Sequence, residues 1–314
     1  MIRPLLHPLR LIALPGWLFP LLLAGRTVAA GSPEVSRHNV VWSSPSTNCW
    51  GTMPLGNGDL AANVWVEPSG DLLLYVAKSD AWDAHARLLK LGLLRLRLQP
   101  APDVAPGGFR QELALREGEV RISMDGGRTR LRIWADAAHP VIRVEGRLSR
   151  ASTVECRLEP WRVSERVLSA TEATGAETFG PREPVVSHPD RFGLGPQDPL
   201  TWYHRNERSV WASTLRHQSM EAWIPEGRDP LLHRTFGAMV RGDGFRRDGP
   251  FVLRGDGPRV RFTLGIHART EHPAEGAAWE AAVRRQADET DAGPVARARA
   301  GHRGGGGGFW ERSW

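Results

Sequence analysis

Lysine and tyrosine are scarce in this chain of 314 residues, which contains two tyrosines and 13 tryptophans. Lys78 and Lys90 are the only lysines among 41 basic residues, so arginine carries almost all of the positive charge. The arginines are interleaved with aspartate and glutamate along the chain. Because nucleic-acid binding normally needs basic residues gathered on one stripe, this dispersion argues against a nucleic-acid partner.

Cysteine is almost absent, with Cys49 and Cys156 as the only two residues of this type. Two cysteines are too few for a disulfide scaffold, and a chain of this length builds a hydrophobic core without one. In an oxidising compartment the two residues can pair, and two buried free thiols fit the sequence equally well.

Long apolar runs are missing after the first 30 residues. Arg3 and Arg10 precede an apolar run from Leu11 to Ala24, and small residues at Val28 and Ala30 match what a signal peptidase reads. This pattern predicts a signal peptide over residues 1–30 and export to the periplasm or beyond. Prolines interrupt the run and it is short for a span, so we expect no stable membrane anchor.

From Asn39 to about Ala268, apolar residues recur mostly at every second position, the spacing that places them on one face of a strand. Turn sequences such as Asp125-Gly126-Gly127 separate these runs. The sequence therefore predicts a mainly β domain over residues 31–270, built as a large antiparallel two-sheet sandwich. The clearest alternating segments are 94–98, 120–124, 130–133 and 260–266.

Two stretches depart from this alternation. Thr171–Pro199 is rich in glycine and proline, which predicts a long surface excursion. Near the end of the chain, Trp279, Ala282, Val283 and Ala287 have helical spacing, which predicts one amphipathic helix after the sheets. We interpret residues 271–314 as a helical linker followed by the start of a further domain.

Tryptophan is the side chain best suited to stacking on the apolar face of a sugar ring, because it is broad, flat and π-rich. Trp50, Trp82 and Trp202 lie in polar sequence contexts typical of loops, and we predict that they contact carbohydrate. The alternative is that these rings pack in the core, as most tryptophans do.

Two polar segments are further candidates for carbohydrate binding. In the turn from Met53 to Asp59, Asn57 lies between two glycines and can present its amide to a hydroxyl; the alternative is a hairpin turn. A strand is expected to end at Val76, and Lys78 and Asp80 follow it together with Trp82, a mixture suited to a polyol. The alternative there is a helix N-cap.

A third polar segment, Tyr203-His204-Arg205-Asn206, follows Trp202. It can form one wall of a site, and the alternative is a solvated strand end. His204 has no partner at metal-ligand spacing, so we expect no metal, and no motif for a nucleotide or another cofactor is present.

Eight segments of the chain form a distinctive combination: 39–46, 53–59, 63–66, 78–83, 87–92, 202–207, 234–238 and 309–314. Together they resemble the bacterial domain of unknown function 5703. That family is similar to the front part of secreted family 95 glycoside hydrolases, the α-L-fucosidase group. The resemblance implies a supersandwich like that of galactose mutarotase, a helical linker and a downstream (α/α)6 barrel that holds the catalytic carboxyls of polysaccharide degradation.

No catalytic residue is carried over to this chain, because the barrel would begin where the sequence ends. The resemblance implies that the turn at Asn57 and the segment from Trp202 to Asn206 face the barrel. We therefore expect an accessory β-sandwich domain of a secreted glycoside-hydrolase-like protein, not catalytic alone, with carbohydrate as its partner. The alternative is a free-standing secreted carbohydrate-binding or surface protein. An independent hydrolase is the weakest hypothesis, because nothing in the sequence fixes two carboxylates at a set separation.

Overall fold

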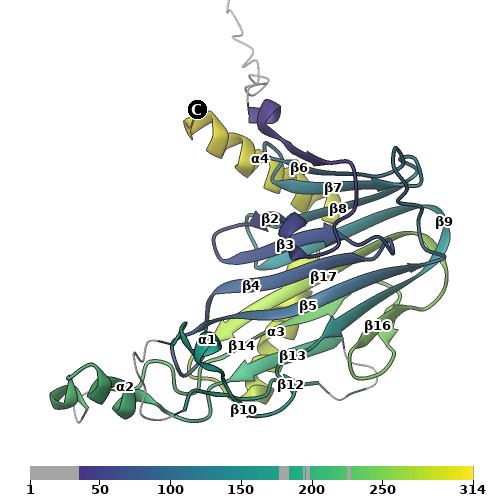
Figure 1. Cartoon of the computed structure of the whole chain (residues 1–314). Coiled ribbons are helices and arrows are strands. Elements are labelled where there is room, and N and C mark those ends of the chain that lie inside the picture. Colours follow the sequence, from purple (N-terminus) through teal and green to yellow (C-terminus); the bar gives the residue numbers. More distant parts are fainter. Residues whose placement is uncertain (1–34, 177–183, 194, 196–198, 225–227, 314) are drawn as a thin grey trace, which may run out of the picture. The chain divides into compact units, whose positions relative to one another are not determined.

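Long antiparallel strands make up most of the computed structural model, which describes residues 35–176, 184–193, 195, 199–224 and 228–313 (Figure 1). Fifteen of the 17 strands join in one hydrogen-bonded network because β9 (Val141–Glu159) belongs to two layers. Residues 141–147 of β9 pair with β8 and β17, and residues 153–159 pair with β5. We call the two layers sheet A and sheet B.

Sheet A runs in the order β1, β6, β7, β8, β9, β17, β14, β13, β12, and sheet B runs β2, β3, β4, β5, β9, β16, β15. The remaining strands of sheet A are β1 (Val40–Trp42), β6 (Arg110–Ala114), β7 (Glu119–Met124), β8 (Thr129–Ala135), β12 (Arg191–Phe192), β13 (Leu200–Arg205), β14 (Thr235–Arg241) and β17 (Arg259–Glu271). Those of sheet B are β2 (Met53–Gly56), β3 (Leu60–Val66), β4 (Leu72–Trp82), β5 (Leu88–Gln99), β15 (Phe245–Arg247) and β16 (Val252–Gly255).

One continuous core lies between the sheets. Leu74 and Leu94 of sheet B and Val144, Phe236 and Ile266 of sheet A belong to the same cluster of buried side chains. Burying each such side chain is worth about 1.5–3 kcal/mol, so the alternating pattern stabilises both layers at once. The predicted mainly β, two-sheet antiparallel sandwich is confirmed.

The alternation fails at one position that we expected to be buried. Val260 is 52% exposed, because the pairing of β17 with β9 shifts register between Arg259 and Arg261. Between these two pairs, residues 148–151 of β9 lie opposite Val260 alone, so the regular alternation of faces is interrupted at this position.

The excursion from Thr171 to Pro199 is only partly described, since residues 177–183, 194 and 196–198 lie outside the described residues. Its described part contains strands of two residues that pair with neighbouring strands; β12, for example, pairs with β13. The other short elements are α1 (Ala170–Ala173), α2 (Trp211–His217), β10 (Arg166–Val167), β11 (Val186–Ser187) and the 3₁₀ helices Val35–His38, Cys49–Gly51 and Glu221–Trp223.

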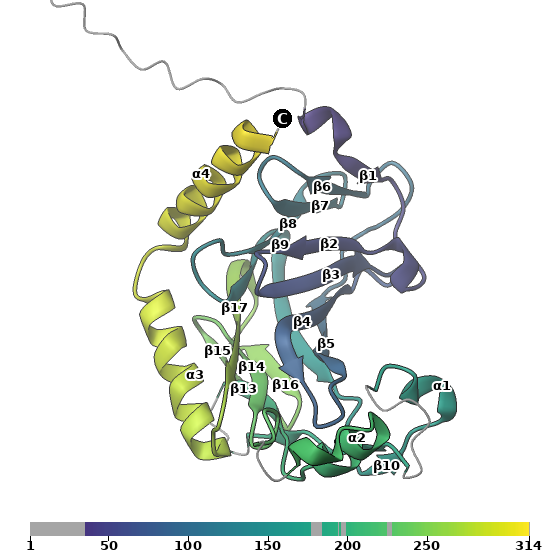
Figure 2. The same ribbon diagram turned by 90° about the vertical axis from the view of Figure 1, so that its left-hand side faces the viewer.

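Two helices, α3 (Gly276–Asp291) and α4 (Val295–Ser313), follow the strands and lie beside the layer that contains β17 (Figure 2). The buried residues of α3 are Trp279, Ala282, Val283 and Ala287, which confirms the helical spacing read from the sequence. The ring of Trp279 packs on Tyr203 at 5.2 Å between centroids, so α3 covers the outer face of sheet A.

The helix α4 was not expected, because it runs through Gly304–Gly308 and each glycine disfavours a helix by about 1 kcal/mol relative to alanine. Contacts with sheet A hold it in place. The ring of His302 packs on Trp134 at 5.0 Å, Arg303 pairs with Glu119 at 2.9 Å, and the Trp310 indole donates to a backbone carbonyl at 2.9 Å. None of the described helices is long and apolar enough to cross a bilayer.

Both cysteines are free thiols, with Cys49 exposed and Cys156 buried in β9. Burial, with a smaller contribution from the charge of Glu155, raises the pKa of the Cys156 thiol to about 12. Cys156 is therefore a neutral core residue. The predicted signal peptide, residues 1–30, lies outside the described residues.

Asp291, at the end of α3, fastens this helix to sheet A. Its carboxylate pairs with Arg143 of β9, accepts from Arg241 Nε of β14 at 2.7 Å, and lies 3.2 Å from His267 Nε2 of β17. Burial alone would raise the pKa of Asp291, but the close contact with His267 and the charges of the neighbouring arginines outweigh it and hold the pKa well below its usual value. Burial lowers the pKa of His267.

We predict that Asp291→Asn lowers the free energy of unfolding at pH 7 by about 1–2 kcal/mol. This loss is smaller than that for breaking a fully buried ion pair, because the Asp291 side chain is 26% exposed. A carboxylate with a depressed native pKa stabilises above its unfolded pKa, so the difference should shrink below about pH 4. Thermal unfolding at pH 7 and pH 3 measures it. Asp288→Asn, which alters a more exposed partner of Arg241, is the control; equal losses for both variants would contradict the prediction.

We also predict that Gly304→Ala with Gly307→Ala stabilises α4 by about 0.5–1 kcal/mol per site, since a Cβ at either position meets no atom within 4 Å. Slower amide hydrogen exchange along α4 is the expected observation. Gly306→Ala is the control, because its Cβ would lie 3.3 Å from the Arg116 carbonyl oxygen. Unchanged exchange in the double variant would show that the glycines do not limit the helix.

Candidate functional site

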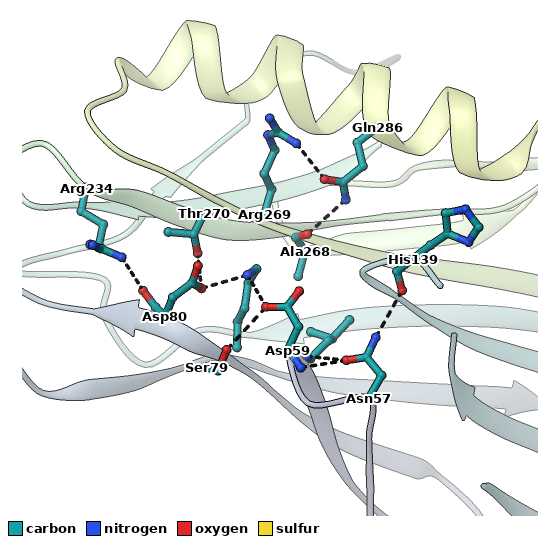
Figure 3. A network of polar contacts seen from close by, with 12 residues as sticks. Asn57, Asp59, Ser79, Asp80, His139, Arg234, Ala268, Arg269, Thr270 and Gln286 are labelled. Atoms are coloured by element: carbon teal, nitrogen blue, oxygen red, sulfur yellow. Dashed lines mark hydrogen bonds and ion pairs between the residues drawn. The ribbon is translucent and has the colours of Figure 1, made fainter. Parts of the chain in front are cut away.

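A polar cluster at one end of the sandwich brings together four of the residues selected from the sequence (Figure 3). The Lys78 ammonium of β4 lies 2.6 Å from Asp59 Oδ1 and 2.9 Å from Asp80 Oδ1. Thr270 of β17 donates its hydroxyl to Asp80 at 2.7 Å, and the Arg234 guanidinium donates to the Asp80 carbonyl at 3.2 Å. The cluster therefore joins sheet B to sheet A with charged and polar groups where the apolar core ends.

Asn57 supports this cluster from the turn between β2 and β3. Its Oδ1 accepts from the backbone amides of Asp59 at 3.0 Å and Leu60 at 2.7 Å, which is the hairpin-turn alternative. Its Nδ2 donates to the carbonyl of Asp136 at 2.7 Å, after β8. The Asn57 amide thus fixes the turn and ties it to sheet A, while Asp59 is left to bind Lys78.

The expected end of a strand at Val76 was wrong, because β4 continues to Trp82. Pairing of Lys78 with Leu60 and of Trp82 with Leu88 extends the strand past an irregularity after Val76. The helix N-cap alternative was also wrong, since a turn follows in which Asp83 Oδ1 accepts from the backbone amide of Arg87 at 2.9 Å. Trp82 is half-buried at the strand end rather than in a loop.

The electrostatics of Asp80 limit the chemistry of this cluster. Burial alone would raise the pKa of Asp80, but hydrogen bonds from Lys78 and Thr270 and the charge of Lys78 outweigh it and hold the pKa below its usual value. A general acid in glycoside hydrolysis needs a raised pKa to carry a proton near neutral pH. Asp80 is instead an ionised acceptor of hydrogen bonds.

Strand β13 separates the next group of candidates onto two faces. Trp202, predicted in a loop, lies in this strand with 1% exposure and donates its indole N–H to the Leu91 carbonyl at 2.8 Å, so the loop prediction was wrong. His204 faces the same interior, 3.0 Å from Asp190 Oδ1 through Nδ1. Asn206, just beyond the strand, donates to the carbonyls of Trp82 at 3.0 Å and Leu231 at 2.9 Å.

Tyr203 and Arg205 face the other way, toward the start of α3. Burial raises the pKa of Tyr203, which packs on Trp279. Arg205 donates to the Ala274 carbonyl at 2.9 Å and pairs with Glu275 at 2.5 Å. The segment predicted to face a barrel thus holds the first turn of α3 in place.

Trp50 is the candidate with the most accessible ring, at 90% exposure in the 3₁₀ helix Cys49–Gly51. Its neighbour Cys49 lies near Tyr75 of β4, whose pKa is raised first by burial and then by Cys49 and the charge of Glu159. Tyr75 packs on Trp161 at 5.6 Å between centroids, and the Lys90 ammonium lies 5.2 Å from its ring centre. We call Trp50, Tyr75, Lys90 and Trp161 the aromatic surface.

Sequence reasoning missed most of the aromatic surface. Tyr75 stands between Leu74 and Val76, and Trp65 between Val64 and Val66, so both outward positions are aromatic where alternation predicts polar residues. The Trp65 and Tyr75 rings lie 5.0 Å apart. This break in the pattern was the available signal. In the part of the chain that the structure describes, no group of three or more histidine, cysteine or acidic side chains could hold a metal ion.

Comparison with known proteins gives one family. The model of DUF5703_N, described as "Domain of unknown function (DUF5703)", matches residues 41–314. No curated protein matches the chain. A solved structure titled "Putative kojibiose phosphorylase from human microbiome" aligns with a TM-score of 0.40 and 8% sequence identity. That alignment covers 87% of this chain and 38% of the other protein, so the chain spans well under half of its length.

We predict that Lys78→Met destabilises the protein by about 1–2 kcal/mol at pH 7, because it leaves two half-exposed carboxylates without their shared cation. This loss lies between those typical of breaking an exposed ion pair and a buried one. The pKa of Asp80 is depressed in the native protein, so its contribution is present above about pH 4 and lost as pH falls further.

Chemical unfolding at pH 7 and pH 3 measures this difference. The exposed Lys90, the only other lysine in the sequence, provides the control. Lys90→Met should change stability by less than about 1 kcal/mol, since it removes only a surface cation–π contact. A Lys78→Met variant as stable as Lys90→Met at pH 7 would disprove a structural role for the cluster.

Proposed function

The chain belongs to the DUF5703_N family, and we propose that it is a carbohydrate-binding β-sandwich domain of a secreted glycoside-hydrolase-like protein. In this proposal the domain binds sugar through the aromatic surface and does not cleave glycosides alone. The observation that carries the proposal is the exposed indole of Trp50, next in sequence to Cys49, which interacts with Tyr75; the Tyr75 ring in turn packs on Trp161.

Sugar binding is the use that best fits this surface. Trp50 is 90% exposed and Trp161 is 44% exposed, although tryptophan rarely leaves so much apolar area in water without a partner. Flat π-rich rings on an open face can stack on the apolar faces of successive sugars in a chain. Lys90, over the Tyr75 ring, adds a donor for hydroxyl groups at the same place.

The absence of catalysis by this domain alone is supported by the state of its carboxylates. Asp59 and Asp80 share the ammonium of Lys78, and the lowered pKa of Asp80 is opposite to that of a proton donor. The proposal places hydrolysis in a further domain, an (α/α)6 barrel, and makes α3 and α4 the linker toward it. The signal-like pattern before Ala30 supports export.

We predict that the purified mature protein binds neutral polysaccharides on a glycan array, and that Trp50→Ala and Trp161→Ala each weaken this binding about tenfold, as expected for aromatic residues central to an interface. Trp223→Ala is the matched control, because Trp223 is a comparably exposed indole elsewhere in the fold. Full binding by both aromatic-surface variants, or no binding by the unaltered protein, would overturn the proposal.

A further inference from the structure

A row of arginines crosses the outer face of sheet A. Arg147 of β9 lies directly opposite Arg130 of β8 on one side and Arg261 of β17 on the other. The row continues through Ser123 of β7, opposite Arg130, to Arg110 of β6. Like charges directly opposite each other in a sheet are destabilising, so this arrangement opposes folding unless another group supplies negative charge.

The neighbouring row, two residues along the strands, contains the acids that the first row lacks. Glu145 of β9 pairs with Arg299 of α4. In the row beyond it, the buried Glu119 of β7 binds Arg121 and Arg132 of the second row at 2.6 Å and 3.0 Å, and Arg303 of α4 at 2.9 Å. The arginines of the second row thus each have an acidic partner within the protein.

The first row is not balanced in the same way. Arg110 lies 3.2 Å from Glu112, and Arg130 donates to the Gly127 carbonyl at 2.8 Å. Within the described residues, Arg147 and Arg261 have no acidic partner, and both side chains are exposed. These two guanidinium groups therefore keep all of their donors for something outside the chain.

A cavity of about 700 Å³ lies over both rows, with Arg299 and Arg303 of α4 in its wall. Eight arginines and two glutamates line it, which makes it strongly positive. A second hollow of about 390 Å³ shares Arg261, Phe262 and Thr263 with the first. Four strand spacings of about 4.8 Å separate β6 from β17, so the row spans about 19 Å, longer than a single small anion requires.

The electrostatics of the cavity agree with its composition. The pKa of Arg132 is lowered first by burial and then also by the charges of Arg299 and Arg303, although Glu119 acts in the opposite direction. A bound anion would relieve this repulsion. Guanidinium groups bind carboxylates and sulfates in a two-pronged geometry that ammonium groups cannot copy.

We propose that this cavity, the arginine groove, binds an anionic glycan, a polysaccharide chain that carries carboxylate or sulfate groups. Arg147 and Arg261 contact its acidic groups directly, and Arg110 and Arg130 extend the site along the chain. The glycan part of this proposal rests on the proposed function, and the anionic part rests on the register of sheet A alone. The length of the row favours a polymer over a free ion.

The experiment compares Arg147→Gln/Arg261→Gln with the control Arg157→Gln/Arg246→Gln, which removes the same charge from exposed arginines on sheet B. Binding is measured by calorimetry with polygalacturonate and heparin as the anionic glycans and dextran as a neutral one. Duplex DNA and vesicles of phosphatidylglycerol and phosphatidylcholine are the other arms.

We expect the unaltered protein and the control to bind an anionic glycan, and the groove variant to bind it at least tenfold more weakly. Trp50→Ala should bind the anionic glycan normally, which separates this site from the aromatic surface. The groove variant should also unfold at the same temperature as the unaltered protein or higher, because it loses like-charge repulsion.

Three results would overturn the proposal. One is equal affinity of the groove and control variants for the anionic glycans. Another is binding of DNA or anionic vesicles as tight as that of either glycan, which would make the groove a general polyanion site. The third is the failure of both anionic glycans to bind. If the unaltered protein binds an anionic glycan but not dextran, that result counts against sugar binding by the aromatic surface and leaves the proposal for the groove standing.

Discussion

The fold depends on one strand that serves two sheets. A strand of 19 residues such as β9 extends about 60 Å, enough to pair with different partners along its two halves. The side-chain alternation does not change phase between them: Ile142 and Val144 in the first half and Val154 and Leu158 in the second all enter the same core. The odd-numbered residues of β9 therefore face outward in both sheets.

That constraint determines what each outer face can do. On sheet A, the outward face receives α3, α4 and the arginine groove. On sheet B, it carries the aromatic surface, which has large flat rings and one lysine. The protein thus presents a charged face and an aromatic face on opposite sides of one core. The Lys78 cluster joins the two sheets at the edge of this core.

The sequence predicted the features that depend on local periodicity. The alternation of apolar residues predicted the sandwich, and their helical spacing near the end of the chain predicted the four buried residues of α3. It could not place Trp202, because a polar stretch around a buried indole looks like a loop until its hydrogen bond to Leu91 is known. It also missed α4, whose glycines disfavour a helix that contacts with sheet A stabilise. In both cases tertiary contacts override local preference.

Register explains why dispersed charges in the sequence become a patch in the structure. Arg110, Arg130, Arg147 and Arg261 are far apart in the chain, and basic and acidic residues are interleaved along the sequence as a whole, which is why we argued from dispersion against a nucleic-acid partner. Antiparallel pairing aligns them in one row, while the acids fall in the next row or under α4. An anion on this row would lie beside Arg299 and Arg303, the residues that fasten α4 through Glu145 and Glu119. The packing of α4 and the binding of an anion in the groove therefore both depend on the charges of Arg299 and Arg303. Because five consecutive glycines weaken α4, this helix is the element whose stability should respond most to a change in those charges.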